Sequence, residues 1–333
     1  MATQGHAPLS PGARAQLVKH RALTLGFARA GIADLAPVPH QPALLRWLEQ
    51  GMAGTMRYMH RQAGRRIEPA TILPGATRAV VVTRNYYSED SPPTPGTGRV
   101  ARYARGRDYH VALEPSLAEL ARYITSLGPK GTLAKPYCDA GPVPERELAQ
   151  RAGLGWIGKN TMLIDPERGS YCFLAVILTD LDLAVDLPFE ADRCGTCRLC
   201  LDACPTHAFP DARVLDSRSC ISYLTIEHRG EVDPALATGF GDWIFGCDIC
   251  QEVCPWNVKF AEVADDPVLK PDPGLARLDL VELSRISDAE FRAKYGKTAL
   301  SRPGASGMRR NARLALRFTA ETAQIAEQDS RPE

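Results

Sequence analysis

Residues 194–205 read Cys194-Gly-Thr-Cys197-Arg-Leu-Cys200-Leu-Asp-Ala-Cys204-Pro205. A second run, Cys247-Asp-Ile-Cys250-Gln-Glu-Val-Cys254-Pro255, follows it, with Cys220 upstream in place of a first cysteine. Both runs end in Cys-Pro, which is the arrangement of the bacterial ferredoxins. The spacing predicts two [4Fe-4S] clusters, because successive Cys-x2-Cys turns direct thiolates at one cube and the proline then turns the chain toward its neighbour.

In that arrangement the last cysteine of each run crosses to the other cluster. The crossing predicts a first cysteine group of Cys194, Cys197, Cys200 and Cys254, and a second cysteine group of Cys204, Cys220, Cys247 and Cys250. Structural zinc is the alternative, since four-cysteine zinc sites also use Cys-x2-Cys pairs. Zinc pairs do not usually form a run of three cysteines followed by a Cys-Pro, so the pattern favours clusters. Cys138 and Cys172 lack ligand spacing and are expected to be small buried residues.

The composition is that of an ordinary globular chain. The 333 residues carry a net charge of +1, with 44% hydrophobic and 24% charged residues. This length fits two packed units, and the balanced charge gives no global attraction to nucleic acid. No apolar run is long enough to cross a bilayer. Ten cysteines, eight of them in the metal-ligand pattern, without a secretory or twin-arginine leader, lead us to expect the cytoplasm.

Working outward from the cysteines, we expect three units. Residues 186–260 are organised by the cysteines, residues 261–333 form a short helical C-terminal segment, and residues 1–185 read as a mixed α/β domain. The apolar patterns predict strands at Ala79–Thr83, Leu133–Tyr137 and Tyr171–Asp180, and helices at Ala13–Ile32, Tyr109–Leu127, Pro144–Ala152, Asp288–Tyr295 and Met308–Phe318. The N-terminal stretch loosely resembles a transit peptide, but its apolar spacing favours a first helix of the folded protein. The last dozen residues are polar and are expected to be frayed.

Two neighbouring clusters form a short electron wire, and we expect its acceptor in the large unit before them. The most informative stretch there runs from Tyr137 to Asn160. Asp139 follows a predicted strand and precedes Gly141-Pro142, a position typical of catalytic carboxylates, although a turn cap would also explain it. The pattern Gly153-x-Gly155-x-x-Gly158 spells a dinucleotide fingerprint, but it follows a helix rather than a strand, so we reject that interpretation.

These stretches resemble the epoxyqueuosine reductases, and the resemblance covers nearly the whole chain. The segments that carry it are Gly51–Met59, Leu73–Ala76, Arg102–His110, Asp139–Asn160, both cysteine runs and Cys220–Glu227. The resemblance implies an α+β protein in which a nitroreductase-like α/β corrinoid-binding domain is joined to a bacterial ferredoxin-like module with two [4Fe-4S] clusters. It also implies an oxidoreductase that reduces epoxyqueuosine to queuosine at the tRNA wobble position, with similarity to the reductive dehalogenases.

The resemblance further implies that cobalamin takes electrons from the clusters and that Asp139 is the acid that protonates the departing epoxide oxygen. A corrinoid-binding Asp-x-His-x-x-Gly signature begins at Asp108-Tyr-His110 but has Leu113 in place of glycine. For Asp139 we expect a pKa raised by burial against the corrin. The expected cobalamin contacts, besides Asp139, are Arg57, Tyr103, Trp156, Gly158, Lys159, Asn160, Ser222 and Asp248.

The expected partners are tRNA bearing epoxyqueuosine and an external low-potential electron donor of the flavodoxin or ferredoxin type. The protein itself is expected to be a monomer. Three arginine-rich stretches are candidates for phosphate contacts. They are Arg61 with Arg65 and Arg66, Arg102 with Arg105 and Arg107, and Arg309 with Arg310, Arg313 and Arg317. The alternatives left open are a dehalogenase-like reductase of a small molecule, an electron-transfer protein without catalysis, and a zinc-stabilised RNA-binding protein.

Overall fold

A four-stranded antiparallel sheet forms the centre of the N-terminal half. In this computed structural model, which describes residues 9–329 with side chains through Phe318, the strand order is β1-β2-β7-β4. The strands are β1 (Arg29–Asp34), β2 (Arg78–Asn85), β4 (Ala134–Tyr137) and β7 (Cys172–Thr179). The last three confirm the predicted strands. Because β7 lies between β2 and β4, its apolar side chains are covered on both faces of the sheet.

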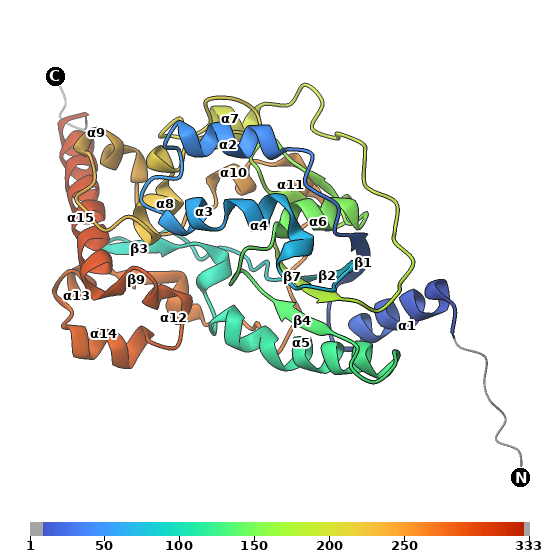
Figure 1. Ribbon diagram of the computed structural model, residues 1–333. Helices are drawn as coiled ribbons and strands as arrows, with labels where there is room; N and C mark the ends of the chain where they lie inside the picture. Colours follow the sequence, from blue (N-terminus) through green and yellow to red (C-terminus); the bar gives the residue numbers. More distant parts are fainter. Residues whose placement is uncertain (1–8, 330–333) are drawn as a thin grey trace, which may run out of the picture.

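Helices cover both faces of this sheet (Figure 1). On one face α1 (Pro11–Thr24) and α5 (Tyr109–Ser126) enclose a core with Val80 and Ile177, and on the other face α6 (Glu145–Arg151) packs over Val81 and Val176. The alternation of Val80, Val81 and Val82 between the two cores follows from the two-residue period of a strand. Helices α5 and α6 confirm the predicted helices, and they bring Asp108–His110 and Glu145 to the ends of the sheet.

The predicted helix at Ala13–Ile32 is wrong in its second half. Helix α1 ends at Thr24, and Gly26 turns the chain with a φ of +87°. Residues Arg29–Asp34 then form strand β1, which pairs with β2. Gly31 has no side chain there because a Cβ would lie 2.2 Å from the carbonyl oxygen of Ala152, at the end of α6. The signal that was missed is Gly26, a residue suited to left-handed helix ends.

A second sheet joins the three predicted units. Strand β3 (Thr97–Val100) pairs with β8 (Trp243–Phe245) on one side and β9 (Arg277–Asp279) on the other. Each strand comes from a different predicted unit, and one core contains Val100, Phe245 and Leu278. The segments on either side of the boundaries expected near residues 185 and 260 therefore contribute to one sheet and one core.

The remaining elements are short, apart from the last helix. They are α2 (Gln41–Glu49), α3 (Arg57–Arg61), α4 (Ala63–Ile67), β5 (Trp156–Ile157), β6 (Leu163–Ile164), α7 (Leu199–Asp202), α8 (Ile221–Ile226), α9 (Pro234–Ala237), α10 (Ile249–Glu252), α11 (Pro255–Phe260), α12 (Pro273–Ala276), α13 (Leu280–Arg285), α14 (Asp288–Tyr295) and α15 (Gly304–Asp329). Five 3₁₀ turns lie at Pro69–Thr71, Arg102–Ala104, Ser217–Ser219, Thr238–Phe240 and Ala299–Ser301. None of the helices between residues 9 and 329 has the length and apolar content needed to span a membrane.

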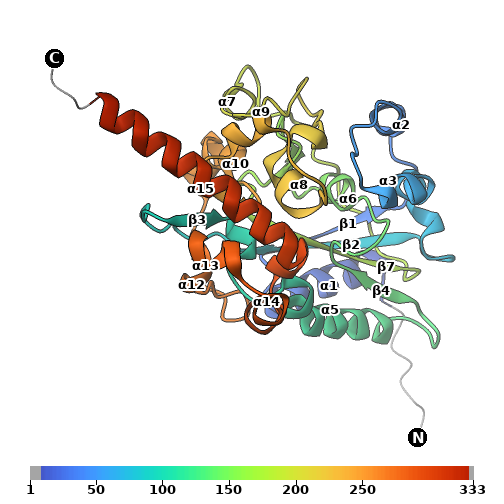
Figure 2. The ribbon, with the colours of Figure 1, turned by 90° about the vertical axis from the view of Figure 1, so that its left-hand side faces the viewer.

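The C-terminal helices lie at the opposite end of the molecule from α1 (Figure 1), and in the view from that end α15 runs across the front (Figure 2). Helix α14 has the predicted bounds. Helix α15 is longer than the predicted Met308–Phe318, and it continues through Asp329 across most of the segment expected to be frayed. The rest of that segment, residues 330–333, lies outside the described residues. Side chains of α15 such as Met308 and Ala312 pack into the same core as β3 and β8, so this helix supports the cysteine-bearing region.

Candidate functional site

The first cysteine group lines one cavity. Cys194, Cys197, Cys200 and Cys254 surround it together with other residues, among them Lys159 and Trp256. A zinc site holds its sulfurs about 2.3 Å from one ion, whereas a cubane spreads its thiolates over separate irons. The donor set therefore fits a [4Fe-4S] cluster better than zinc.

The second cysteine group lies against the catalytic half of the chain. Cys220 precedes α8, while Cys247 and Cys250 stand at the start of α10. Burial raises the pKa of the Cys247 thiol, and the nearby Cys220 and Cys204 thiols raise it further. The structure thus brings the eight cysteines together in the two groups that the crossing predicts. Their role as ligands stays a prediction.

The two remaining cysteines lie outside both groups. Burial raises the pKa of Cys138 and also that of Cys172. Both side chains are therefore neutral thiols at physiological pH, which disfavours a redox role because the thiolate is the reactive form.

The β5–β6 hairpin (Trp156–Ile164) binds the cysteine loops. The Trp156 side chain is buried, with 2% of its surface exposed, and its Nε1 donates a hydrogen bond to Cys194 Sγ at 3.3 Å. Lys159 Nζ donates to the carbonyl oxygens of Gly195 at 2.6 Å and Cys197 at 2.8 Å. Asn160 Nδ2 donates to the carbonyl oxygen of Cys250 at 3.3 Å.

The hairpin contacts both cysteine groups, since Trp156 and Lys159 bond the first and Asn160 bonds the second. Gly158 is buried under Ile164 within the hairpin, where a Cβ would lie 2.5 Å from the Ile164 side chain. The hairpin also reaches toward the Asp139 loop, because Arg146 Nη1 donates to the Thr161 carbonyl oxygen at 2.7 Å and the Arg146 charge lowers the pKa of Asp139. The role of these four residues as cobalamin contacts stays a prediction.

Asp248 is also part of the protein interior. Its side chain is almost fully buried, and Oδ2 accepts hydrogen bonds from the backbone N of Arg102 at 2.8 Å and from its Nη1 at 3.2 Å. Burial raises the pKa of Asp248, and Arg102 lowers it. Arg105 is buried and ion-paired with Asp90. Arg102 and Arg105 therefore form no surface patch for tRNA.

In the third arginine stretch, Arg309 and Arg310 also bond to other residues of the protein. Arg309 pairs with Asp288 at 2.8 Å. Arg310 donates to the carbonyl oxygens of Leu224 at 2.6 Å and His228 at 2.9 Å. These bonds fix α15 to α8 and α14, which gives both arginines a structural role.

Asp139 lies in the loop between β4 and α6 and has a backbone φ of +53°, a strained value for a residue other than glycine. Tyr109 OH donates a hydrogen bond to its Oδ2 at 2.5 Å, and His110 Nε2 lies 3.7 Å from the same oxygen. The other ring nitrogen of His110 lies 2.8 Å from Asp108 Oδ1. The Asp139 side chain is 64% exposed, so a substrate can reach it.

The protonation states in this site are set by its hydrogen bonds and charges. Hydrogen bonds to Asp108 and Asp139 raise the pKa of His110 to about 9. The His110 ring, 3.7 Å away, and the hydrogen bond from Tyr109 hold the pKa of Asp139 below its usual value despite some desolvation. The raised pKa expected from burial against a bound corrin stays a prediction for the loaded protein. At neutral pH the proton of this pair resides on His110.

Two side chains anchor the Asp139 loop (residues 138–144). Arg66 Nη2 donates to the Gly141 carbonyl oxygen at 3.1 Å, and its Nη1 donates to that of Val143 at 3.2 Å. Glu145 Oε1 accepts the backbone N–H of Asp139 at 2.8 Å. Burial, with the Asp139 charge next, raises the pKa of Glu145 to about 8. Arg66 thus positions the catalytic loop instead of presenting its guanidinium to a phosphate.

Tyr103 connects Asp139 with the second cysteine group. Its ring packs against three separate cores, one of which also contains Met56, Cys220 and Cys247. Burial raises the pKa of Tyr103, and the charges of Asp139 and Asp248 raise it further, so both carboxylates lie near its hydroxyl. Met56, Tyr103, Cys220 and Cys247 therefore pack at one junction, which reaches toward Asp139 through Tyr103. Arg57 and Ser222 are sequence neighbours of Met56 and Ile221 in this core, and their role as cobalamin contacts stays a prediction.

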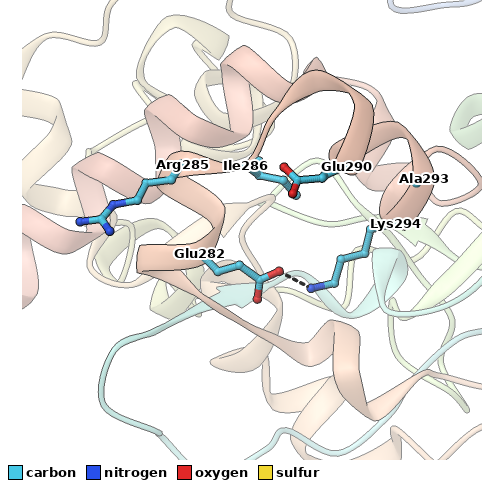
Figure 3. A pocket seen from close by; sticks show the side chains of 6 residues that line it. All are labelled: Glu282, Arg285, Ile286, Glu290, Ala293 and Lys294. Carbon is cyan, nitrogen blue, oxygen red and sulfur yellow. Dashed lines mark hydrogen bonds and ion pairs between the residues drawn. The ribbon is translucent and has the colours of Figure 1, made fainter.

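A separate pocket of about 620 Å³ lies between α13 and α14 (Figure 3). It is lined by Glu282, Arg285, Ile286, Glu290, Ala293 and Lys294. Two of these side chains form an ion pair, with Lys294 Nζ 2.6 Å from Glu282 Oε1. The pocket contains none of the predicted site residues, so we assign it no part in the chemistry.

Comparisons with known proteins identify the family. Residues 193–257 match the 4Fe-4S double cluster binding domain, and residues 66–140 match the domain described as epoxyqueuosine reductase QueG, DUF1730. An epoxyqueuosine reductase of Gloeobacter violaceus is 44% identical over 90% of this chain and 94% of its own length, and one of Pseudomonas aeruginosa is 39% identical over 96% and 90%. The chain belongs to the epoxyqueuosine reductase family.

Solved epoxyqueuosine reductases share the fold. One, crystallised with an epoxyqueuosine-modified tRNA stem loop, matches with a TM-score of 0.84 and 30% identity over 94% of this chain and 83% of its own. Another, from Bacillus subtilis, has a TM-score of 0.83 at 30% identity over the same shares, and its catalytic aspartate loop is swung out of the active site. These likenesses favour an epoxyqueuosine reductase over the dehalogenase-like, electron-transfer and zinc-protein alternatives.

Sequence reasoning missed four residues of this epoxyqueuosine reductase site: Tyr109, His110, Arg66 and Glu145. Tyr109 and His110 belong to the stretch Asp108–His110, which we considered only as an incomplete corrinoid signature. A signal was present, since a Tyr-His pair after a helix-capping aspartate places two proton-bearing groups at a helix start. No local pattern distinguishes Arg66 from its neighbour Arg65, because its partners lie about 75 residues away.

Proposed function

We propose that this chain reduces epoxyqueuosine to queuosine at the wobble position of tRNA, with cobalamin and two [4Fe-4S] clusters as its cofactors. The observation that carries the proposal is the position of Asp139. It combines an exposed carboxylate, a hydrogen-bonded tyrosine and a protonated histidine at a junction that Tyr103 shares with the second cysteine group. Such a site holds a proton next to an electron source, which a reductive elimination of oxygen requires.

The residues at the junction fit a corrin. Arg57 and Ser222 provide polar groups for its amide rim, while Met56 and the Tyr103 ring provide an apolar wall next to Cys220 and Cys247. When bound, cobalamin supplies low-potential two-electron chemistry at the epoxide carbon. Asp139 then lies on the substrate side, in reach of the epoxide oxygen.

The protein supplies the protons. Reduction of the epoxide to the cyclopentene takes two electrons and two protons, and the oxygen leaves as water. An unprotonated oxygen is a poor leaving group, so a proton must reach it as the carbon–oxygen bond breaks. His110, whose pKa is about 9, holds that proton at neutral pH. Asp139 Oδ2, which faces both His110 and Tyr109, is placed to relay it to the oxygen.

The two cysteine groups suggest a direction for the electrons. Arg193, Gly195 and Thr196 of the first group's loop are exposed, whereas Gly246 and Asp248 beside the second group are buried. An external low-potential donor of the flavodoxin or ferredoxin type therefore reaches the first cluster, and the second cluster passes electrons to the junction. Action as a monomer in the cytoplasm belongs to the same proposal.

The tRNA approaches over α3 and α4. Arg61 and Arg65 are exposed there, and no carboxylate pairs with them among the side chains described through Phe318. Arg66, in the same helical segment, anchors the Asp139 loop, so phosphates bound by these arginines lie near the active site. Backbone contacts position an RNA loop, and the unstacked wobble base can then enter the site.

The direct test is conversion of the tRNA nucleoside. The protein is purified without oxygen, its clusters are reconstituted, and it is incubated with cobalamin, a chemical reductant and tRNA bearing epoxyqueuosine. We expect mass spectrometry of the digested tRNA to show queuosine only when cobalamin is present. Loaded protein that leaves epoxyqueuosine unchanged would refute the proposed function.

A further inference from the structure

The indole of Trp156 forms the only side-chain N–H hydrogen bond to a sulfur of the eight cluster-forming cysteines among the residues described. Its Nε1 lies 3.3 Å from Cys194 Sγ. The ring is held by Trp256 in an edge contact with centroids 4.9 Å apart and by Phe189 in a stacked contact at 5.7 Å. Because the indole is buried and packed on both sides, this hydrogen bond has a fixed geometry.

Two cations line the same cavity. Lys159 Nζ is fixed by the carbonyl oxygens of Gly195 and Cys197, and the Arg193 guanidinium lies 5.3 Å from the centre of the Phe189 ring and 5.9 Å from that of Trp256. Neither cation forms an ion pair with a carboxylate in the described part of the chain. The carboxylate of Asp192 also lies at this group, where Oδ1 accepts the backbone N–H of Cys194 at 3.0 Å, but its charge is balanced by Arg213 at 2.6 Å. The cavity is therefore electropositive.

The second cysteine group has different surroundings. Cys204 Sγ accepts the backbone N–H of Ala208 at 3.4 Å and lies 3.7 Å from Thr206 Oγ1. Backbone N–H groups also donate to Cys220 and Cys247, but no side-chain N–H does so among the residues described. The charged side chain next to Cys247 is Asp248, and its charge is balanced by the buried guanidinium of Arg102. This group thus has no unbalanced cation close to it and is surrounded by buried residues.

Reduction adds one electron to a cluster and makes its core and thiolates more negative. Hydrogen bonds to the sulfurs, nearby positive charge and solvent exposure all stabilise that added charge and raise the reduction potential. Backbone N–H groups donate to sulfurs of both groups, so the two groups differ in the Trp156 indole, the two cations and the exposure of the loop, and these three features favour the first group. We propose that Trp156, supported by Lys159 and Arg193, makes the cluster of Cys194, Cys197, Cys200 and Cys254 the more easily reduced of the two.

The inference rests on the cluster part of the proposed function and deepens it. A protein that holds one electron keeps it on the first cluster, at the exposed end of the wire. The second cluster, next to the junction, is reduced only when a further electron arrives. The chain thereby stores one electron and delivers two, which matches the two-electron reduction of an epoxide.

The test is a redox titration with dithionite as the electron source, followed by electron paramagnetic resonance, on protein whose iron content has been measured. Trp156→Phe keeps the ring but removes the N–H. We expect the higher of the two midpoint potentials to fall while the lower one stays, and we expect Lys159→Gln to act in the same direction. Trp47→Phe is the matched control, because it removes an indole N–H that donates to the Leu215 carbonyl oxygen instead of a cysteine sulfur.

Unchanged midpoints in Trp156→Phe, or a shift confined to the lower potential, would overturn the inference. If this variant loses iron, the wild-type protein with ¹⁵N-labelled indole decides the question. The half-reduced protein should then show a coupling between the unpaired electron and the labelled nitrogen, and absence of that coupling counts against the inference. Wild-type protein that binds no clusters would instead refute the proposed function, which separates the two failures.

Discussion

The Asp139 loop and the β5–β6 hairpin flank the same short helix, α6, yet they differ in how the chain holds them. The loop has an exposed carboxylate, a strained φ of +53° at Asp139, and anchors that come from the side chains of Arg66 and Glu145. The hairpin is buried, and glycines let its backbone pack closely: a Cβ at Gly155 would lie 2.1 Å from the Ile164 carbonyl oxygen. We interpret the loop as the part that performs chemistry and the hairpin as a rigid support for the cysteine groups.

Motifs that are adjacent in the sequence need not have the same role, as the Asp139 loop and the β5–β6 hairpin show. The stretch from Tyr137 to Asn160 suggests one cofactor site, but α6 directs its two ends to different places. Substitutions in the loop should alter turnover without changing stability, and substitutions in the hairpin should alter stability, cluster loading or redox potential.

The largest expected effect is at Asp139. Asp139→Asn removes the carboxylate that relays the proton, so turnover should fall by about a hundredfold to ten-thousandfold, the usual contribution of a general acid. Iron and cobalamin content should be unchanged. Asp182→Asn, at an exposed surface ion pair with Arg78, is the control and should retain wild-type turnover. Near-normal turnover in Asp139→Asn would remove this residue from the mechanism.

The next effect tests the hairpin. Gly155→Ala forces a side chain against backbone and should lower the free energy of unfolding by about 1–3 kcal/mol, a typical cost of overpacking. Chemical denaturation and iron analysis measure the outcome. Gly12→Ala, at a helical position with open space around it, is the control and should not destabilise the protein. A stable Gly155→Ala variant with full cluster content would show that the hairpin is not a rigid support.

Arg66 and Arg65 provide a matched pair of neighbours. Arg66→Gln removes the bonds to the Gly141 and Val143 carbonyl oxygens, so the Asp139 loop is misplaced and kcat should fall about tenfold. Arg65→Gln removes an exposed cation and should raise KM for tRNA with kcat unchanged. Identical kinetic changes in the two variants would contradict the division of roles.

The smallest expected effect is the pH dependence of turnover. His110 has a pKa raised from 6.5 to about 9, so it is protonated below pH 9 and loses its proton above it. Single-turnover rates should therefore stay level through neutral pH and decline above about pH 9. In His110→Gln the rate should be lower and this decline should be absent. A decline that begins near pH 6.5 would mean that His110 is not paired with Asp108 and Asp139.

The sequence predicted those parts whose signal is local. The eight cluster cysteines follow from their spacing, the strands β2 and β7 and the helices α5 and α6 follow from apolar periodicity, and Asp139 follows from its strand-end position and the family resemblance. The parts that escaped depend on distant contacts. The sheet of β8, β3 and β9 joins segments from residues 97–279, and the bond from Tyr109 to Asp139 spans 30 residues.

The pKa of Asp139 escaped for the same reason. From the sequence alone we expected an apolar surface over Asp139, but the group that lowers its pKa is His110, which lies on helix α5. The bond from Trp156 to Cys194 also escaped, because its two residues lie 38 positions apart in the sequence. In both cases the residue type suggested a functional role, but the residue that it contacts could not be inferred from the sequence.

The most direct test of the account is the position of the metals in the loaded protein. Crystals of the protein with reconstituted clusters and cobalamin would be measured at the iron and cobalt absorption edges. We predict iron at both cysteine groups and cobalt at the junction between the Asp139 carboxylate, Tyr103 and the second cysteine group. Cobalt beside Trp156 and Lys159, or no cobalt in protein that carries both clusters, would contradict the division between catalytic loop and cluster-supporting hairpin.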